Sequence, residues 1–244
     1  MVNGTPDQSR ITRWLDNASP AWFSIYAMLA AFSTYFCMYA FRKPFAAATY
    51  GGLDFLGTGL NHKTVFVISQ IIGYTISKYL GCKYCSEISR GMQARVLIAM
   101  IVVAELSLLG FALLPPNLKV LAIFINGLPL GMVWGLVSRY LEGRKTAELL
   151  FAGLSCSYIV ASSSVKTIGG WLMETGVSEF WMPVATGGIF LIPFMVAVFF
   201  LNQLPLPTAE DEANRNKRTT MNRQDRMIFL KQFLLGMLML LLLY

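Results

Sequence analysis

Residues 96–114 read VLIAMIVVAELSLLGFALL, and this stretch decides the fold class. Only one ionisable side chain, Glu105, interrupts a run of apolar residues that Pro115 and Pro116 bring to an end. A helix that crosses the bilayer core needs about 20 mostly apolar residues. The stretch therefore predicts a membrane-spanning helix.

Six further stretches of the chain follow the same pattern, and turn residues or charges bound them: Ala21–Phe41, Thr64–Gly81, Leu118–Val137, Ala147–Met173, Phe180–Leu204 and Met227–Tyr244. The 244 residues are 55% hydrophobic and 14% charged, whereas about 25% of the residues of a soluble domain are charged. We therefore predict an all-α membrane protein, with a six-helix transmembrane bundle and one further helix.

The domain organisation follows from these stretches. We expect a cytoplasmic N-terminal segment (1–20), a six-helix transmembrane domain (21–204), a cytoplasmic linker (205–226) and the start of a seventh transmembrane helix (227–244). Within the N-terminal segment, Ser9–Asn17 suits a short helix on the membrane surface or a disordered tail.

Lys and Arg residues set the orientation, because they are enriched in cytoplasmic loops. With the N-terminus inside, the inner segments hold Arg10, Arg13, Lys83, Arg90, Arg95, Arg139, Arg144, Lys145, Arg215, Lys217, Arg218, Arg223 and Arg226. The outer segments then hold only Arg42, Lys43, Lys63 and Lys119. We expect a multi-pass protein of the cell (inner) membrane with a cytoplasmic N-terminus. This bias explains most of the net charge of +7, so no nucleic-acid partner is expected.

A few ionisable residues lie inside the predicted spans, where they are costly and mark functional sites by default. They are Lys78, Glu105 and Lys166. Arg42 and Lys43 join them if the first helix continues past Pro44, as the apolar residues after Pro44 lead us to expect. The alternatives are that Lys78 and Lys166 snorkel to the headgroups and that Arg42 is an interfacial anchor.

This set contains more cations than acids, which favours an anionic solute. Tyr35, Tyr39 and Arg42 follow an i, i+4, i+7 spacing and so share one helix face. Two phenol groups beside a guanidinium suit a phosphate or carboxylate, because Arg binds such oxyanions bidentately. The alternative is that both tyrosines are packing residues.

The segment Tyr35-Phe-Cys-Met-Tyr39-Ala-Phe-Arg42-Lys43-Pro-Phe resembles the first-helix motif of the organophosphate:phosphate antiporters, a family of the major facilitator superfamily. The segment Gly73–Gly81 is similar to their second-helix segment, whose lysine falls on Lys78. The resemblance implies that the chain is the N-terminal six-helix half of a transporter, with Arg42 as the residue that binds the substrate phosphate.

The chain also departs from this resemblance. The loop between the second and third spans, Gly81–Arg90, is longer than the superfamily motif and lacks its Asp-Arg pair. Tyr158 stands where the antiporters have a fifth-helix histidine, and the second substrate arginine belongs to a seventh helix. These departures indicate a divergent branch, so the identity of its solute does not follow from that of its relatives.

The remaining motifs point to structure. Gly127, Gly131 and Gly135 form a double small-xxx-small pattern that suits close helix packing. Cys82 and Cys85 have a metal-like spacing without a second ligand pair, and the chain has one His, so we expect no metal, no cofactor and no enzymatic activity. Cys37 and Cys156 lie in apolar runs and are expected to be buried.

We therefore expect a secondary active transporter that moves a small organic anion, such as a phosphate ester, by alternating access. Its substrate site would comprise Arg42, Tyr35, Tyr39, Lys78, Lys166 and Glu105, with Glu105 neutralising one cation when the site is empty. Its partners would be the bilayer and either a missing C-terminal half or a second copy. The alternatives are a proton-coupled symporter with Glu105 as the proton carrier, a non-transporting sensor of the same fold and, least favoured, a membrane enzyme.

Overall fold

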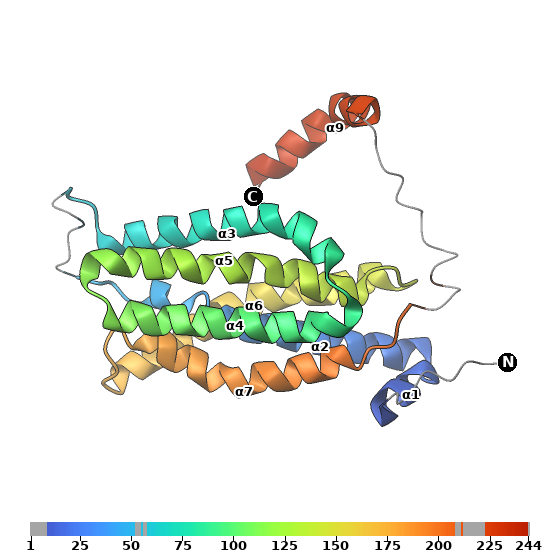
Figure 1. Cartoon of the computed structure of the whole chain (residues 1–244), viewed down its shortest axis with the longest axis horizontal. Helices are drawn as coiled ribbons and strands as arrows, with labels where there is room; N and C mark the ends of the chain where they lie inside the picture. Colours follow the sequence, from blue (N-terminus) through green and yellow to red (C-terminus); the bar gives the residue numbers. More distant parts are fainter. Residues whose placement is uncertain (1–8, 52–54, 56–57, 208–210, 212–222, 244) are drawn as a thin grey trace.

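The computed structural model describes residues 9–51, 55, 58–207, 211 and 223–243 (Figure 1). Over these residues the regular structure is helical, without a β-strand. The six long helices are α2 (Pro20–Tyr39), α3 (His62–Glu87), α4 (Arg90–Leu113), α5 (Pro116–Leu141), α6 (Ala147–Glu174) and α7 (Met182–Asn202). The other helices are α1 (Arg10–Asp16), the 3-10 helix η1 (Pro44–Ala47) and α9 (Arg223–Leu243).

The six long helices lie side by side along the length of the molecule, and successive helices run in opposite directions (Figure 1). Two of them are central: α5 packs against α3 and α4, and α2 packs against α6 and α7. Packing between α4 and α7 closes the bundle on one side. We call the end at which α2, α4 and α6 begin the basic end, because Arg90, Arg139, Arg144 and Lys145 lie there.

Local sequence signals explain the helix boundaries. Ser19 caps α2 by accepting from the backbone N–H of Trp22, with Pro20 in the first turn. Asn61 caps α3 by accepting from the N–H of Lys63 at 2.8 Å. At the end of α6, Gly176 has a φ of 99°, a left-handed conformation that glycine adopts without steric cost.

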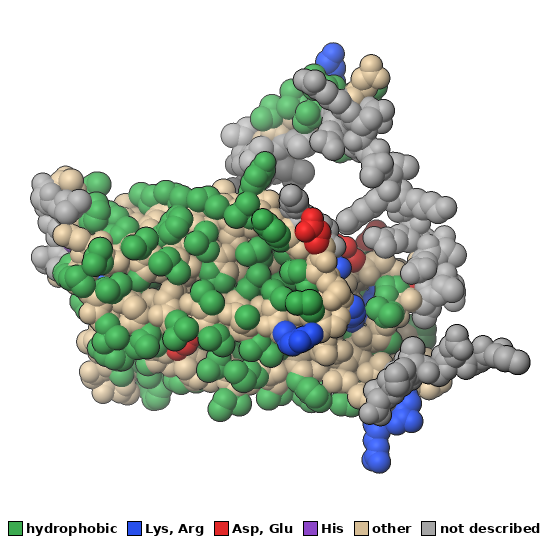
Figure 2. Space-filling model, viewed as in Figure 1, with side chains coloured by type: hydrophobic (Ala, Val, Ile, Leu, Met, Phe, Trp, Pro, Cys, Tyr) green, Lys and Arg blue, Asp and Glu red, His purple; other side chains and the backbone are tan. Residues whose placement is uncertain are grey.

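The surface of the bundle fits a membrane. Five helices (α2, α4, α5, α6 and α7) are long and apolar enough to cross one. Large apolar side chains on them are exposed, for example Leu29, Leu106, Ile159 and Ile192, each at least 60% exposed. Figure 2 shows hydrophobic side chains over most of the visible face and basic side chains toward one end. The predicted fold class, an all-α multi-pass membrane protein, is confirmed.

Exposed tryptophans mark both ends of the bundle. Trp14 and Trp22 lie at the basic end, and Trp171 and Trp181 lie at the opposite end. Tryptophan is enriched at the two membrane–water interfaces, so this arrangement agrees with helices that span the bilayer. α3 forms where a span was predicted, although Gln70 and Lys78 make it less apolar than the other five long helices.

Two local expectations are wrong. The first helix does not continue past Pro44: α2 ends at Tyr39, and the following residues form turns and then η1. Pro44 has no backbone N–H, and a proline ring clashes with the carbonyl group four residues earlier, here that of Ala40, so an α-helix cannot continue through it. Cys156 is exposed, whereas Cys37 is buried as expected.

Of the two alternatives for Ser9–Asn17, a short helix or a disordered tail, the structure shows the helix, because α1 covers Arg10–Asp16. Leu15 is buried, and the hydroxyl of Thr12 donates to the backbone oxygen of Gln203 at 3.0 Å. Contact of α1 with the membrane stays a prediction. Residues 1–8 and most of the expected linker 205–226 lie outside the described residues.

Candidate functional site

The turns after α2 present Arg42. The N–H groups of Arg42 and Lys43 both donate to the backbone oxygen of Tyr39, at 3.0 and 2.9 Å. The chain therefore continues in a helix-like turn as far as Lys43. Arg42 consequently lies close to the helix face that carries Tyr39. Pro44 then starts η1 and turns the chain away.

The Arg42 guanidinium lies among aromatic rings. Its central carbon is 3.9 Å from the centre of the Tyr74 ring and 5.7 Å from the centre of the Tyr39 ring. Its Nε atom is buried and has no hydrogen-bond partner. A cation over an aromatic face is stabilised electrostatically, but this contact leaves the N–H donors of the guanidinium free to bind an oxyanion.

The aromatic residues around Arg42 connect four helices. The Tyr35 ring contacts Tyr39 on α2 and Trp134 on α5, with ring centres 5.6 and 5.1 Å apart. Trp134 in turn contacts Tyr158 on α6 at 6.2 Å. The phenol groups of Tyr35 and Tyr74 lie close enough to interact, which brings α2 and α3 together at this point.

Three lysines add positive charge. Lys78 lies with its Nζ atom 5.1 Å from the centre of the Tyr74 ring. Lys43 is half-buried; its burial, together with the nearby charges of Arg42 and Lys166, lowers its pKa below the ordinary value. Among the described residues none of these cations forms an ion pair with a carboxylate. We call this set the Arg42 cluster; it comprises Tyr35, Tyr39, Arg42, Lys43, Tyr74, Lys78, Trp134, Tyr158 and Lys166.

A buried amide pair holds the backbone that carries Arg42. Asn126 on α5 is fully buried and donates to the backbone oxygens of Phe41 and Ala104, each at 3.1 Å. Gln70 on α3 donates to Asn126 at 2.8 Å and to the backbone oxygen of Arg42 at 3.0 Å. The carbonyl groups left over at the end of α2 are thus satisfied by side chains, which fixes the position of Arg42.

The glycines of α5 bring α3 close. A Cβ atom on Gly127 would lie 2.9 Å from the backbone nitrogen of Tyr74, and one on Gly131 would lie 2.7 Å from Cβ of Ser77. Only a hydrogen side chain permits this approach, so the predicted role of the small-xxx-small pattern in helix packing is confirmed. The close contact also places Tyr74 and Lys78 beside Arg42.

Glu105 is not part of this cluster. It lies on α4 at the contact with α7, where a Cβ atom on Gly187 would overlap its Oε2 atom. Oε2 is buried without a hydrogen-bond partner, and no cation of the described residues forms an ion pair with it. The structure thus brings together Tyr35, Tyr39, Arg42, Lys78 and Lys166 of the predicted site but places Glu105 at a different helix contact.

Sequence reasoning missed several residues. Tyr74 precedes Lys78 by four positions and so shares its helix face, a signal that could have revealed it. Lys119 was expected in an outer loop, but it is buried at the start of α5, where its Nζ donates to the backbone oxygens of Phe111 and Ala112 at 2.6 and 3.1 Å. Its role is to satisfy the C-terminal carbonyls of α4.

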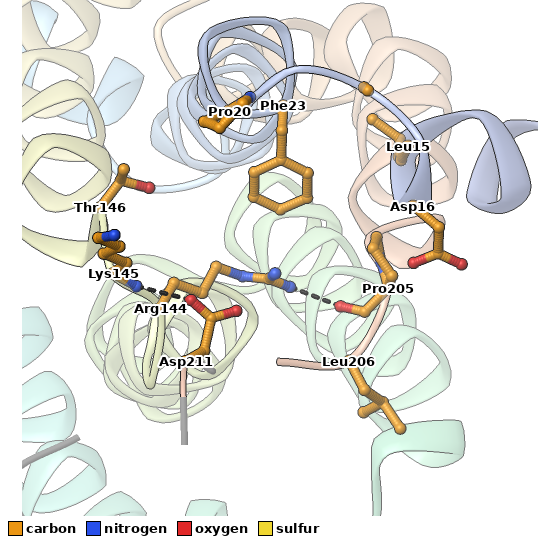
Figure 3. A pocket seen from close by; sticks show the side chains of 11 residues that line it. Leu15, Asp16, Pro20, Phe23, Arg144, Lys145, Thr146, Pro205, Leu206 and Asp211 are labelled. Carbon is orange, nitrogen blue, oxygen red and sulfur yellow. Dashed lines mark hydrogen bonds between the residues drawn. The ribbon is translucent and has the colours of Figure 1, made fainter. Parts of the chain in front are cut away.

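At the basic end, a pocket of about 240 Å³ lies between the start of α2, the α5–α6 loop and the segment after α7 (Figure 3). Arg144 reaches into it and donates to the backbone oxygens of Tyr140 and Pro205, at 3.2 and 2.5 Å. Burial lowers the pKa of Arg144 to about 10, so it stays charged at neutral pH. Asp16 and Asp211 line the same pocket, so it lacks the excess of cations that marks the Arg42 cluster.

The fold and the cluster define a class: a multi-pass, all-α membrane protein with a cationic, aromatic cluster between its helices. Residues 44–244 match the family described as "Family of unknown function (DUF5690)", and the chain belongs to this family. No curated protein and no solved structure matches the chain.

Proposed function

We propose that the protein is a secondary active transporter of a small organic anion, which binds at the Arg42 cluster. The observation that carries this proposal is the Arg42 guanidinium, which packs on Tyr74 at 3.9 Å while its buried Nε has no hydrogen-bond partner. A buried donor without a partner is unfavourable, and an oxyanion would supply the missing acceptor.

The charge of the cluster supports an anion over a cation or a neutral solute. Lys43, Lys78 and Lys166 add to the charge of Arg42, and no carboxylate of the described residues compensates them. A planar guanidinium binds phosphate and carboxylate groups through two parallel hydrogen bonds. The phenol groups of Tyr35 and Tyr39 would orient the solute. A phosphate ester fits this set, because its charge of nearly −2 uses more than one cation.

The arrangement of the cluster supports transport. Its residues come from α2, α3, α5 and α6, so its geometry changes whenever these helices move relative to one another. Secondary transporters bind their solutes between helices near the middle of the bilayer and expose the site alternately to each side. We include in this proposal that the protein is a divergent relative of the organophosphate:phosphate antiporters within the major facilitator superfamily.

The proposal also includes an orientation. The basic end would face the cytoplasm, because Lys and Arg accumulate on that side of membrane proteins. The N-terminus would then be cytoplasmic, and the membrane would be the cell (inner) membrane.

Uptake into proteoliposomes tests the proposal. The protein is reconstituted and offered radiolabelled glycerol 3-phosphate, inorganic phosphate or succinate. We expect saturable uptake of at least one of these anions, loss of uptake in Arg42→Lys and normal uptake in Arg95→Lys, which changes an exposed arginine at the start of α4. Anion binding without uptake would instead support a sensor of the same fold. Absence of both binding and uptake would refute the proposal.

A further inference from the structure

Glu105 places a carboxyl group inside the membrane-spanning part of the bundle. It lies eight residues before Leu113, the last residue of α4, which corresponds to about 12 Å along the helix axis. Its carboxyl group rests on the backbone of α7: a Cβ atom on Gly187 would lie 2.9 Å from Cδ of Glu105, and one on Gly188 would lie 3.8 Å from Oε1. The glycine pair thus provides the space that the carboxyl group occupies.

Among the described residues, no cation forms an ion pair with this carboxyl group. α7 has no ionisable residue between Met182 and Asn202. The segment after α2 contributes the Phe41 ring, which lies 3.1 Å from the position of a Cβ atom on Gly187. From α5, the side-chain amide of Asn126 donates to the backbone oxygen of Ala104, the residue before Glu105. The cations of these elements have other neighbours: Arg42 packs on the Tyr74 ring, and Lys43 lies near the charges of Arg42 and Lys166. Lys119 donates to the carbonyls of α4, and Arg139 donates to the backbone oxygens of Cys85 and Ile88.

Oε2 of Glu105 is buried and accepts no hydrogen bond. An ionised carboxylate without a cation or a donor is strongly disfavoured in such a place, whereas a neutral carboxylic acid is tolerated. We propose that Glu105 is a proton-binding site within the membrane, and that its carboxyl group is protonated in the conformation described here.

The hydrogen bonds of Asn126 connect this site to the Arg42 cluster. Asn126 donates to the backbone oxygen of Ala104, the residue before Glu105, and to that of Phe41, the residue before Arg42. The Phe41 ring and the Glu105 carboxyl group also meet at Gly187. Loss of the proton would leave a charge that draws in water or a cation, which requires α4 and α7 to separate. The shared amide would transmit this movement to Arg42. The proton would thereby be coupled to the anion, an extension that rests on the proposed function.

Infrared difference spectroscopy tests the proton site without any anion. The protein is reconstituted in lipid, and spectra are recorded as the pH is changed. We expect a protonated carboxyl band that is lost in Glu105→Gln and kept in Glu148→Gln, which changes an exposed residue at the start of α6. The band should disappear when the pH is raised far enough for the carboxyl group to lose its proton. Because Glu105→Gln could unfold the protein, Glu105→Asp serves as a second variant and should shift the band. A wild-type spectrum without a band that depends on residue 105 would overturn the proposal.

A second measurement tests the coupling. Glycerol 3-phosphate is added to weakly buffered protein with a pH indicator, and proton uptake or release is recorded. We expect a proton change in the wild type and in Glu148→Gln, and none in Glu105→Gln. Equal proton changes in all three proteins would refute the coupling. Failure of the wild type to bind the anion would refute the proposed function, while the infrared band would still decide whether Glu105 binds a proton.

Discussion

The guanidinium carbon of Arg42 lies 3.9 Å from the centre of the Tyr74 ring. This contact joins the turns after α2 to α3, and it stabilises the cation without a carboxylate partner. A salt bridge would occupy the same N–H donors that an anionic solute needs. Packing on an aromatic face holds the arginine in place and leaves its N–H donors available.

This relationship predicts the effect of changes at Tyr74. Removal of the ring in Tyr74→Leu should weaken the binding of glycerol 3-phosphate about 2- to 30-fold, because a cation–π contact contributes about 0.5–2 kcal/mol. Tyr74→Phe keeps the ring and loses only the hydroxyl group, so its affinity should lie between those of the wild type and Tyr74→Leu. Calorimetric titration of the three proteins measures this order. Wild-type affinity in Tyr74→Leu would show that the ring does not position Arg42.

Contact between α3 and α5 predicts a second effect. A Cβ atom on Gly131 would lie 2.7 Å from Cβ of Ser77 and would overlap the backbone oxygen of Tyr74. Gly131→Ala must therefore separate the two helices, at a cost of about 1–3 kcal/mol in unfolding free energy, and should weaken anion binding. Gly170→Ala is the matched control, because nothing lies within 4 Å of its new Cβ atom. Thermal unfolding in detergent compares them, and equal midpoints for the two variants would contradict the packing argument.

The helices could be predicted from the sequence because each is a long apolar run between prolines, glycines or charges. Part of the site could be predicted too: Tyr35, Tyr39 and Arg42 follow one another on a single stretch, where helical spacing fixes which residues meet. Although the α-helix ends at Tyr39, the turns that follow it hold Arg42 close to the Tyr39 ring, so the predicted proximity of these residues is retained.

Contacts between distant segments could not be predicted in the same way. Asn126 bonds to Phe41 and Ala104, which are 85 and 22 positions away, and no local pattern specifies these partners. Lys119 follows two prolines and looks like a loop residue, yet α5 starts early enough to bury it. The position of Glu105 depends on how α4 packs against α7. The number of charged residues in the predicted spans does not reveal this packing.

Lys43 predicts a pH dependence. Burial and the charges of Arg42 and Lys166 lower its pKa below the ordinary value of 10.5. As the pH rises through this lowered pKa, Lys43 loses its charge, so anion affinity should fall in a pH range where an ordinary lysine is still protonated. A phosphate ester keeps its charge there, because its second pKa is about 6. Titrations at several alkaline pH values compare the wild type with Lys43→Met, which should bind more weakly at neutral pH and lose this part of the pH dependence. The same alkaline decline in both proteins would exclude Lys43 as its source.

The basic end predicts the orientation. Glu148 and Thr175 are exposed residues at opposite ends of α6. In a variant whose four cysteines are replaced by alanine, Thr175→Cys should react with a membrane-impermeant thiol reagent added to intact cells. Glu148→Cys should react only after the cells are opened. The reverse pattern would invert the proposed orientation, and labelling of both sites from outside would contradict a membrane-spanning α6.

Trp134 provides a direct measurement of the central claim, that the Arg42 cluster binds an organic anion. Its ring lies 5.1 Å from Tyr35 and 6.2 Å from Tyr158, inside the cluster, whereas Trp14, Trp22, Trp171 and Trp181 are exposed. Replacement of these four residues by Phe leaves Trp134 as the only tryptophan, so its fluorescence reports on the cluster alone.

Titration of this single-tryptophan protein with glycerol 3-phosphate should change the Trp134 fluorescence in a saturable manner. Arg42→Lys in the same background should weaken binding about 10- to 100-fold, because a point charge loses the bidentate contact. Arg95→Lys should leave the titration unchanged. If Arg42→Lys binds as tightly as its parent, or if glycerol 3-phosphate, inorganic phosphate and succinate all leave the fluorescence unchanged, the Arg42 cluster is not an anion site.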